Sequence, residues 1–565
     1  MKSVFHGVIE HDLIFPFPEM KADERESVAL MLDNIRKFCE TRVDSNAIDR
    51  DHEIGEDVLS GMKEMGLFGL AIPEEYGGLG LSTSAYARIM QEVAAHDASL
   101  AVTLGAHQSI GCKAIVLLGT EAQKRKYLPK LAAGEQVAAF ALTEPGAGSD
   151  AASITTRAEL SPDGEHYILN GSKIWITNGG FADVFTVFAR TTELDPTAKP
   201  KITPLIVERG HGVKSGPNEE KMGIRGSSTT EIFFDDVRVP SGNVIGETGR
   251  GFKVAMEVLN NGRLGLAAGC VGACKRLIDL TSERVLERKA FGRPISEFGM
   301  IKEKIGRMVS ETYALESMTY LTTGLVDRGA DYSVESAICK VFGSETLWMI
   351  VHETLQIAAG IGYMVEYPYE RLMRDARINM IFEGTNEILR AFIALAGMQG
   401  PGRMLAEVGR AMREPIKGFG PLSEYVIHRA RSVIGRERLM RAHPVLAAET
   451  VLFERRTADL STAVERVLRK HGKEIAERQF VQKRIAEVAM DLYALSATLS
   501  RTTRAIEARG EEGARREIEL CQGFAVLAER RLEDRLHEME RDSDELLKSI
   551  ANRTCEDRGY PLDVL

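Results

Sequence analysis

The feature that most constrains the fold of this chain is a block of short strand-like segments between two helical stretches. Apolar residues recur at helical spacing from about residue 24 to 135. From 136 to about 245, short runs rich in β-branched and aromatic residues alternate with turn residues. Helical periodicity returns at Phe252, runs to about 396, and resumes from about 405 to 552. This order predicts an α+β protein that is mainly helical.

We expect four structural units, because 565 residues fill three or four domains of ordinary size. The Gly/Pro cluster Gly397–Gly402 is interpreted as the last boundary. The predicted units are an N-terminal helical domain at 1–135, a middle β domain at 136–247, a helical bundle domain at 248–400 and a C-terminal helical domain at 401–565.

The middle block predicts a small antiparallel barrel or sandwich, because its strands are short and its turns frequent. The pair Asn170-Gly171 between two of the strands predicts a β-hairpin turn. The candidate strands are Ala138–Thr143, Thr156–Leu160, Tyr167–Asn170, Lys173–Thr177, Val184–Ala189, Thr203–Val207 and Glu231–Phe234.

Composition and charge limit the function classes. The net charge of −10 argues against a nucleic-acid binder, which needs a basic face. Seven scattered cysteines without a CxxC pair are typical of a reducing compartment, and no metal site is predicted. Residues 1–20 resemble neither a presequence nor a secretory signal, and the apolar stretches fall short of the ~20 residues of a membrane span. We expect a bacterial cytoplasmic protein, peripheral at the inner membrane in one interpretation, or a mitochondrial one whose presequence has been removed.

A Gly-rich loop follows the first candidate strand, in the segment Phe140–Asp150. Its glycines let backbone N–H groups approach a polar planar or anionic ligand, and Thr143 and Ser149 add hydroxyls. An ordinary inter-strand loop is the alternative. The segment is not a GxGxxG before a helix, so a Rossmann-type nicotinamide site is not indicated.

Two further segments carry ligand-binding residue types. Strand alternation puts Trp175 and Thr177 on one face, where a flat aromatic and a hydroxyl suit an isoalloxazine ring; a core Trp beside a turn Thr is the alternative. In Arg288–Ile295, an Arg at a helix end precedes a Gly/Pro turn and can pair with a pyrophosphate. A charge that stabilises the helix C-terminus is the alternative there.

Glu383 is a carboxylate in an apolar run, directly before Gly384. Apolar surroundings raise a carboxyl pKa, which suits a base that abstracts a weakly acidic carbon proton. The glycine lets the backbone approach a ligand. A helix-terminal Glu is the alternative interpretation.

Together these segments resemble the acyl-CoA dehydrogenase family along almost the whole chain. The motifs, in the family's order, are Leu-Thr-Glu-Pro-Gly-x-Gly-Ser-Asp, Trp-Ile-Thr-Asn-Gly, Arg-Lys-x-Phe-Gly, Leu-Gln-x-x-x-Gly and Glu-Gly-Thr-Asn. Five motifs in order outweigh the isolated alternatives above. The very-long-chain subgroup is the most similar, on Gly105–Gly111, Leu259–Arg263 and a helical tail beyond Gly400 that shorter-chain members lack.

The resemblance implies FAD as the cofactor. Trp175 would pack on one flavin face, Thr177 would bond near flavin N5, and the Gln356–Gly360 loop would hold the adenosine side of a partner subunit's flavin. The implied cofactor contacts are Phe140, Leu142, Thr143, Gly148, Ser149, Trp175, Ile176, Thr177, Arg288, Phe291, Gln356, Gly360, Thr385, Asn386 and Glu387.

The resemblance also implies an acyl-CoA substrate. Small residues around Val102 and Ala106 would leave a long apolar tunnel for the acyl chain; close packing of two helices is the alternative. The implied substrate contacts are Ser149, Asn260, Arg263, Gly384, Val102 and Ala106.

The implied reaction has Glu383 as its catalytic base. Glu383 would remove the α-proton while a β-hydride passes to flavin N5, giving a trans-2-enoyl-CoA in fatty acid β-oxidation. An electron-transfer flavoprotein would then reoxidise the flavin. Gly299 and Ala290 replace a Gln and a Thr of tetrameric members, which favours a homodimer. The alternatives are an acyl-CoA oxidase and a non-catalytic assembly or scaffold relative.

The tail contains a basic amphipathic segment at 425–443, in which five Arg residues accompany an apolar stripe. Such a helix can lie on an anionic membrane, or it can pack on its own domain.

Overall fold

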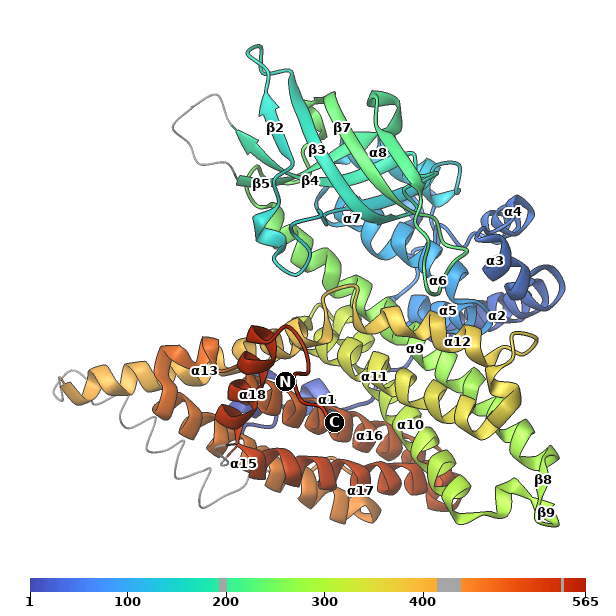
Figure 1. The fold of residues 1–565 in the computed structure, drawn as a ribbon, viewed down its shortest axis with the longest axis vertical. Coiled ribbons are helices and arrows are strands. Elements are labelled where there is room, and N and C mark those ends of the chain that lie inside the picture. The colour runs from blue at the N-terminus through green and yellow to red at the C-terminus, as the bar shows by residue number, and fades with distance from the viewer. Residues whose placement is uncertain (193–200, 414–437, 540–542, 565) are drawn as a thin grey trace. The chain divides into compact units, whose positions relative to one another are not determined.

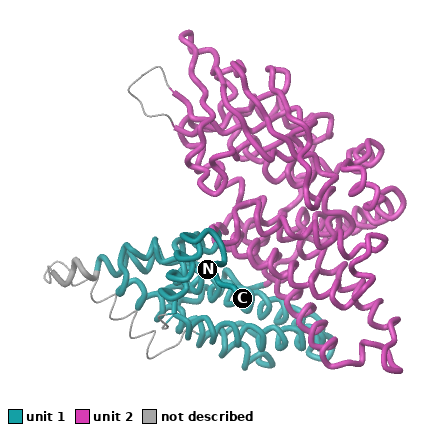
Figure 2. Tube along the Cα trace, viewed as in Figure 1, with its two compact units in different colours: residues 1–16, 389–565 teal, residues 17–388 magenta. Residues whose placement is uncertain are grey.

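The structure, a computed structural model, contains two compact units (Figures 1 and 2). The larger unit runs from Phe17 to Ile388, and the smaller joins Met1–Pro16 to Leu389–Leu565. The predicted fold class is confirmed, since helices dominate and a curled sheet forms the middle of the larger unit. The residues described are 1–192, 201–413, 438–539 and 543–564.

Short helices with distinct start signals form the N-terminal part of the larger unit. The Thr120 hydroxyl and the Gln123 amide make a capping box that begins α8. A π-helix, Ala106–Gly111, separates α6 from α7. The helices are α2 (Ala22–Arg42), α3 (Ser45–Asp51), α4 (Glu56–Glu64), α5 (Thr83–His96), α6 (Ala98–Gly105), α7 (Lys113–Leu118) and α8 (Glu121–Ala132).

One mixed sheet forms the middle of the larger unit, in the order β1-β4-β2-β3-β7-β6, with β5 paired to β4. Both β1 and β2 run parallel to β4, so the prediction of a purely antiparallel sheet is wrong. The strands are β1 (Ala138–Ala141), β2 (Arg157–Leu160), β3 (His166–Thr177), β4 (Val184–Thr192), β5 (Lys201–Glu208), β6 (Lys214–Asn218) and β7 (Thr229–Pro240).

The Asn170-Gly171 pair does not make the predicted hairpin, because β3 continues through it. The Asn170 amide donates to Asp236 Oδ1 at 3.0 Å, and the Asp236 N–H donates back to Asn170 Oδ1 at 2.9 Å. Gly171 has a φ of 140° at a register shift, and a Cβ there would lie 2.7 Å from Thr156 Oγ1. The glycine therefore serves a β-bulge. The sequence also missed β6, an edge strand that contains Gly and Pro.

Long helices complete the larger unit. Helix α9 packs so closely on α5 that a Cβ at Gly272 would lie 1.9 Å from the Gln91 carbonyl oxygen. The elements are α9 (Gly251–Glu287), the small hairpin β8 (Lys289–Ala290) and β9 (Arg293–Pro294), α10 (Gly299–Asp327), α11 (Ser333–Ala358), α12 (Tyr369–Arg377) and the first residues of α13 (Asn386–Arg413).

The cluster Gly397–Gly402 does not interrupt the chain, because α13 runs through it. A Cβ at Gly397 would lie 2.2 Å from the Phe5 ring, and one at Gly400 would lie 2.3 Å from His6 Nε2. The glycines therefore seat the N-terminal segment against α13 within the smaller unit. The boundaries of the four predicted domains stay a prediction.

The rest of the smaller unit is helical. Residues 414–437 lie outside the described part of the chain, so most of the basic segment 425–443 does too. The described elements are α1 (His11–Ile14), α15 (Ala447–His471), α16 (Gln479–Gly513), α17 (Arg515–Glu538) and α18 (Asp544–Glu556).

One stretch of described residues, Ala98–Leu118 in the larger unit, is long and apolar enough to cross a membrane. However, 67% of an 18-residue apolar segment within this stretch is buried inside the fold. The stretch is longer than the apolar runs expected from the sequence, and the polar residues Thr103, His107 and Gln108 within it are also buried. It forms one wall of the cavity described next.

Candidate active site

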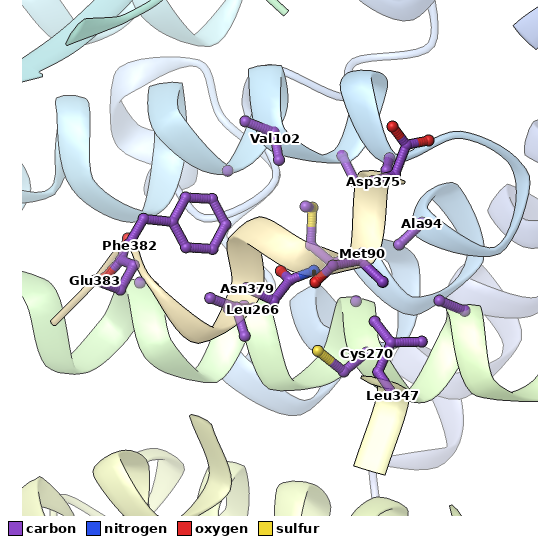
Figure 3. A pocket seen from close by; sticks show the side chains of 18 of the residues that line it. Met90, Ala94, Val102, Leu266, Cys270, Leu347, Asp375, Asn379, Phe382 and Glu383 are labelled. Atoms are coloured by element: carbon purple, nitrogen blue, oxygen red, sulfur yellow. Dashed lines mark hydrogen bonds between the residues drawn. The ribbon is translucent and has the colours of Figure 1, made fainter. Parts of the chain in front are cut away.

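Glu383 lies in the loop between the 3-10 turn Ile378–Met380 and α13, at one end of a cavity (Figure 3). Its φ is 60°, and that of Gly384 is 92°. The left-handed conformation costs a non-glycine residue about 1–2 kcal/mol, so neighbouring groups must hold the loop. Arg263 on α9 provides one such contact, because its Nε donates to the Glu383 carbonyl oxygen at 3.2 Å.

The Glu383 carboxylate has unusual electrostatics. Its Oε2 atom is buried and has no hydrogen-bond partner among the described residues. Burial raises the pKa of Glu383 to about 7, while the charges of Arg263 and Lys340 limit the rise. A carboxylate with this pKa and an unused acceptor atom has the properties of a general base near neutral pH.

The cavity that begins at Glu383 and Phe382 extends to Asp375 and Ala94 at its other end (Figure 3). Its volume is about 140 Å³. Helices α5 and α6 and the π-helix form one wall, and α9 forms another. Most residues on these walls are small: Ala94, Ala98, Ala101, Val102, Gly105, Ala106, Gly262, Gly265, Gly269 and Ala273.

The α9 wall gives the cavity its length. It includes both Gly262 and Leu277, which are fifteen residues and therefore about 22 Å apart along the helix axis. Gly262 also makes room for the carboxylate, since a Cβ there would lie 2.6 Å from each Glu383 carboxylate oxygen. The sequence placed Val102 and Ala106 beside a tunnel, and both residues line this cavity.

The Gly-rich loop after β1 is anchored by a buried ion pair that sequence reasoning missed. Lys173 Nζ on β3 donates to Glu144 Oε1 at 2.8 Å, and both residues are buried. Thr155 Oγ1 and the Thr156 N–H donate to the same carboxylate. Burial raises the pKa of Glu144, but the Lys173 charge and these donors outweigh it and lower the pKa to about 2. The loop is thus held at its first residue, while space around Gly146 and Gly148 stays open.

The end of β3 bulges between Lys173 and Ile176, which interrupts the simple alternation expected there. Trp175 has a φ of 58° and is 60% exposed, whereas Ile176 is buried. Thr177 lines the same cavity as Glu383. The bulge therefore leaves an exposed indole two residues from a threonine that lines the cavity.

The other predicted cofactor residues fall into two groups. On the β domain, Phe140 packs on Phe188, Leu142 is buried, Thr143 is half-buried, and Gly148 and Ser149 are exposed. On the helical part, four residues are exposed and are not among the residues that line the cavity: Arg288, Phe291, Gln356 and Gly360.

Polar side chains near Glu383 bond mainly within the chain. Asn260 Oδ1 accepts from Arg263 Nη1 at 2.8 Å, and Arg263 is itself buried. Thr385 Oγ1 accepts from the Ile388 N–H at the start of α13, and Glu387 is exposed. The Asn386 side chain is buried, and its hydrogen bonds go to α11. Contacts of Arg263 and Asn386 with ligands stay predictions that this geometry does not favour.

The most informative residues that the sequence missed are the buried lysines Lys173 and Lys340. Lys173 directly precedes the apolar run Ile174-Trp175-Ile176, and Lys340 interrupts one, between Ile338-Cys339 and Val341-Phe342. A lysine in or beside such a run is rarely buried without partners, and this signal could have identified both.

The chain has features that fit a flavin. The exposed Trp175 indole offers a flat apolar face, the open loop at Gly146 and Gly148 lets backbone approach a ligand, and Thr177 lines the cavity. The unpartnered Glu383 carboxylate lines that cavity too.

Family models match nearly the whole chain. They are Acyl-CoA dehydrogenase, N-terminal domain (25–135), middle domain (139–237) and C-terminal domain (249–398), followed by ACAD9/ACADV, C-terminal domain (444–560).

Similar proteins agree with these matches. The chain is 45% identical over 550 residues to the very long-chain specific acyl-CoA dehydrogenase, mitochondrial, of Homo sapiens, covering 96% of this chain and 84% of that protein. An acyl-CoA dehydrogenase structure complexed with FAD, from Bacillus anthracis, is 33% identical with a TM-score of 0.80, covering 100% of this chain and 96% of that one. A structure described as the electron transferring flavoprotein of Acidaminococcus fermentans is 37% identical with a TM-score of 0.63, covering 67% and 98%.

The matched domains, the relatives and the carboxylate at the cavity end lead to one assignment: the chain belongs to the acyl-CoA dehydrogenase family and is an FAD-dependent oxidoreductase that dehydrogenates acyl-CoA.

Proposed function

We propose that this enzyme converts long- or very-long-chain acyl-CoA to trans-2-enoyl-CoA in fatty acid β-oxidation, with Glu383 as the catalytic base. The observation that supports this most is the buried, unpartnered Oε2 of Glu383 at the end of a cavity lined mainly by small apolar residues. An apolar cavity binds the acyl chain through its buried surface, at ~0.8 kcal/mol for each methylene.

The proton transfer follows from the surroundings of Glu383. As the family resemblance implies, the Glu383 N–H would donate a hydrogen bond to the thioester oxygen, which acidifies the α-carbon as other oxyanion contacts do. Glu383 Oε2, which has no hydrogen-bond partner among the described residues, would then accept the α-proton. Bound FAD supplies the acceptor for the β-hydride.

The cofactor would be held by two sets of residues. Phe140, Leu142, Thr143, Gly148, Ser149, Trp175, Ile176 and Thr177 would hold the flavin of their own chain. Arg288, Phe291, Gln356 and Gly360 are exposed, and in a homodimer they are available to a second chain's cofactor. Phe291 is 95% exposed, so its ring is available to a second chain.

The length of the cavity supports a long acyl chain as the substrate. The α9 wall is ~22 Å long, which exceeds the ~15 Å depth that the acyl chains of one leaflet contribute to a ~30 Å bilayer core. The family resemblance to the very long-chain specific human enzyme points the same way.

Gly105→Leu tests the chain-length proposal, because Gly105 lines the cavity and a Cβ there would lie 3.9 Å from its nearest neighbour, Met90 Cε. The ratio of kcat/KM for hexadecanoyl-CoA to that for octanoyl-CoA should fall by about 10- to 200-fold. Gly306→Leu, at an exposed position on α10, is the matched control. An unchanged ratio in Gly105→Leu would show that the cavity beside Gly105 does not hold the acyl chain.

Partners and location extend the proposal. An electron-transfer flavoprotein accepts the electrons, and the chain works as a homodimer in a bacterial cytoplasm or, if it has lost a presequence, in a mitochondrion. The human relative is mitochondrial and the FAD-bound one is from a bacterium, so the relatives are compatible with either. Membrane contact through 425–443 rests on sequence alone, and deletion of that segment should abolish liposome flotation.

The direct test of the reaction is an anaerobic titration of the purified yellow protein with acyl-CoAs of graded length. Long-chain thioesters should bleach the flavin, and electron-transfer flavoprotein should restore its colour. No bleaching with any thioester would refute the proposal. Stoichiometric peroxide in air would instead favour an oxidase.

A further inference from the structure

Lys340 on α11 is a fully buried cation that the proposed reaction does not use. Its exposed fraction is 0%, and its Nζ donates to the Gly384 carbonyl oxygen at 2.8 Å and to Asn386 Oδ1 at 2.9 Å. Burying an ammonium is unfavourable unless its donors are satisfied. A lysine in this place therefore needs a reason beyond packing, and its two acceptors lie one and three residues after Glu383.

A second buried cation contacts the same loop from another helix. Arg263 Nε on α9 donates to the Glu383 carbonyl oxygen at 3.2 Å. Arg263 and Lys340 therefore bond consecutive carbonyl groups, those of Glu383 and Gly384. Both loop residues have positive φ angles, of 60° and 92°. Two helices thus fix the backbone conformation that directs the Glu383 side chain.

Asn386 completes the attachment. Its Nδ2 donates to Ser344 Oγ and to Glu345 Oε1, each at 3.0 Å. Its Oδ1 accepts from Lys340 and, at 3.3 Å, from Ser344. The first residue of α13 is thereby tied to α11 immediately after the Glu383 loop.

We infer that Lys340 is a positioning residue for this enzyme: together with Arg263 it holds the Glu383-Gly384 loop and places a positive charge at the loop that carries the base. The inference rests on the proposed role of Glu383. Lys340 is not among the residues that line the cavity, and it acts through the loop.

The charges around Glu383 support this role. Arg263 on α9 and Lys340 on α11 face it, and the neutral Tyr86 hydroxyl on α5 is also within its field. The electrostatic interactions of Lys340 with Cys270 and Glu345 raise the Lys340 pKa. Burial raises the pKa of Glu383 to about 7, and the two cations oppose that rise. Burial lowers the pKa of Lys340 to about 8, and Glu383 opposes that fall.

The test is the pH dependence of kcat/KM for a long-chain acyl-CoA, measured on FAD-loaded variants. Lys340→Met removes the charge at similar length, and Lys340→Gln removes it while keeping donors for the two acceptors. Without the charge the Glu383 pKa rises, so the acid limb of the profile should move up by about one pH unit or more. Lys340→Arg keeps the charge, and its acid limb should stay near the wild-type position even if the rate falls.

Ser344→Ala is the matched control, because it removes a neutral partner of Asn386 and leaves the charge. Its acid limb should superimpose on that of the wild type. A wild type that never bleaches with acyl-CoA would refute the proposed function itself. If the wild type bleaches and the acid limb of Lys340→Gln or Lys340→Met is unmoved, the positioning role is overturned, whatever the loss of rate.

Discussion

Two buried lysine–glutamate sites in the larger unit use the same residue types with opposite results. At the base of the Gly-rich loop, Lys173 bonds the Glu144 carboxylate directly at 2.8 Å. At the cavity end, Lys340 bonds backbone and amide oxygens beside Glu383 and leaves the carboxylate Oε2 unpartnered. The pKa of Glu144 is lowered to about 2, and that of Glu383 is raised to about 7. The Lys173–Glu144 ion pair stabilises a loop, whereas Lys340 positions the loop that carries the proposed base, Glu383.

Whether the lysine bonds the carboxylate or a neighbouring oxygen determines whether the carboxylate can accept a proton near neutral pH. Glu144 is saturated by Lys173 and two threonines, so it has no capacity to take a proton near neutral pH. Glu383 retains an unused oxygen in an apolar cavity. Substitutions at either site test this difference.

The largest effect is expected for Glu383→Gln. Loss of the base should lower the rate of flavin bleaching by acyl-CoA about 10²- to 10⁴-fold, with the yellow colour retained. Stopped-flow absorbance under anaerobic conditions measures this rate. Because the substitution removes an unpartnered buried carboxylate, the free energy of unfolding should not fall. A bleaching rate close to that of the wild type would assign the base elsewhere.

Glu144→Gln should have the opposite profile. It leaves the Lys173 ammonium buried without its counter-ion, which destabilises proteins by about 3–5 kcal/mol. Urea unfolding at pH 7 measures this loss. The folded pKa of Glu144 lies below its ordinary value of 4.5, so its contribution is present above pH 4.5 and is lost as the pH falls toward 2. Equal stability of Glu144→Gln and Glu383→Gln would erase the distinction between the two sites.

A smaller effect is expected for Gly262→Ala, which displaces the base without removing it. The added Cβ would lie 2.6 Å from both Glu383 oxygens, so the carboxylate must move. Misplacement of a catalytic group by about 1 Å costs about 10²-fold in rate. Gly306→Ala on α10, where a Cβ meets nothing within 4 Å, is the control for helix propensity. Equal catalytic rates for the two variants would show that the added Cβ does not displace the Glu383 carboxylate from its working position.

Local sequence patterns anticipated much of this molecule. The order of helices, sheet and helices follows from periodicity, and Glu383, Val102 and Ala106 do line one cavity. Patterns that depend on distant partners failed. Asn170-Gly171 became a bulge because β7 supplies Asp236 as a partner.

The remaining errors have the same origin. Gly397–Gly402 stayed helical because the N-terminal Phe5 and His6 pack against its glycines. Both buried lysines were missed because their acceptors lie 29 and 44 residues away in the sequence, at Glu144 and Gly384. A local apolar run can mark such a lysine as unusual, but it does not identify the distant acceptor.

The most direct test of the central claim is the pH dependence of kcat/KM for the wild-type, FAD-loaded enzyme with a long-chain acyl-CoA. Since Glu383 must be ionised to accept a proton, activity should fall as the pH drops through about 7, its raised pKa. The decline should follow a single ionisation. A profile that stays flat from pH 8 down to the ordinary carboxyl value of 4.5 would contradict the account, because it would show that no buried, unpartnered carboxylate serves as the base.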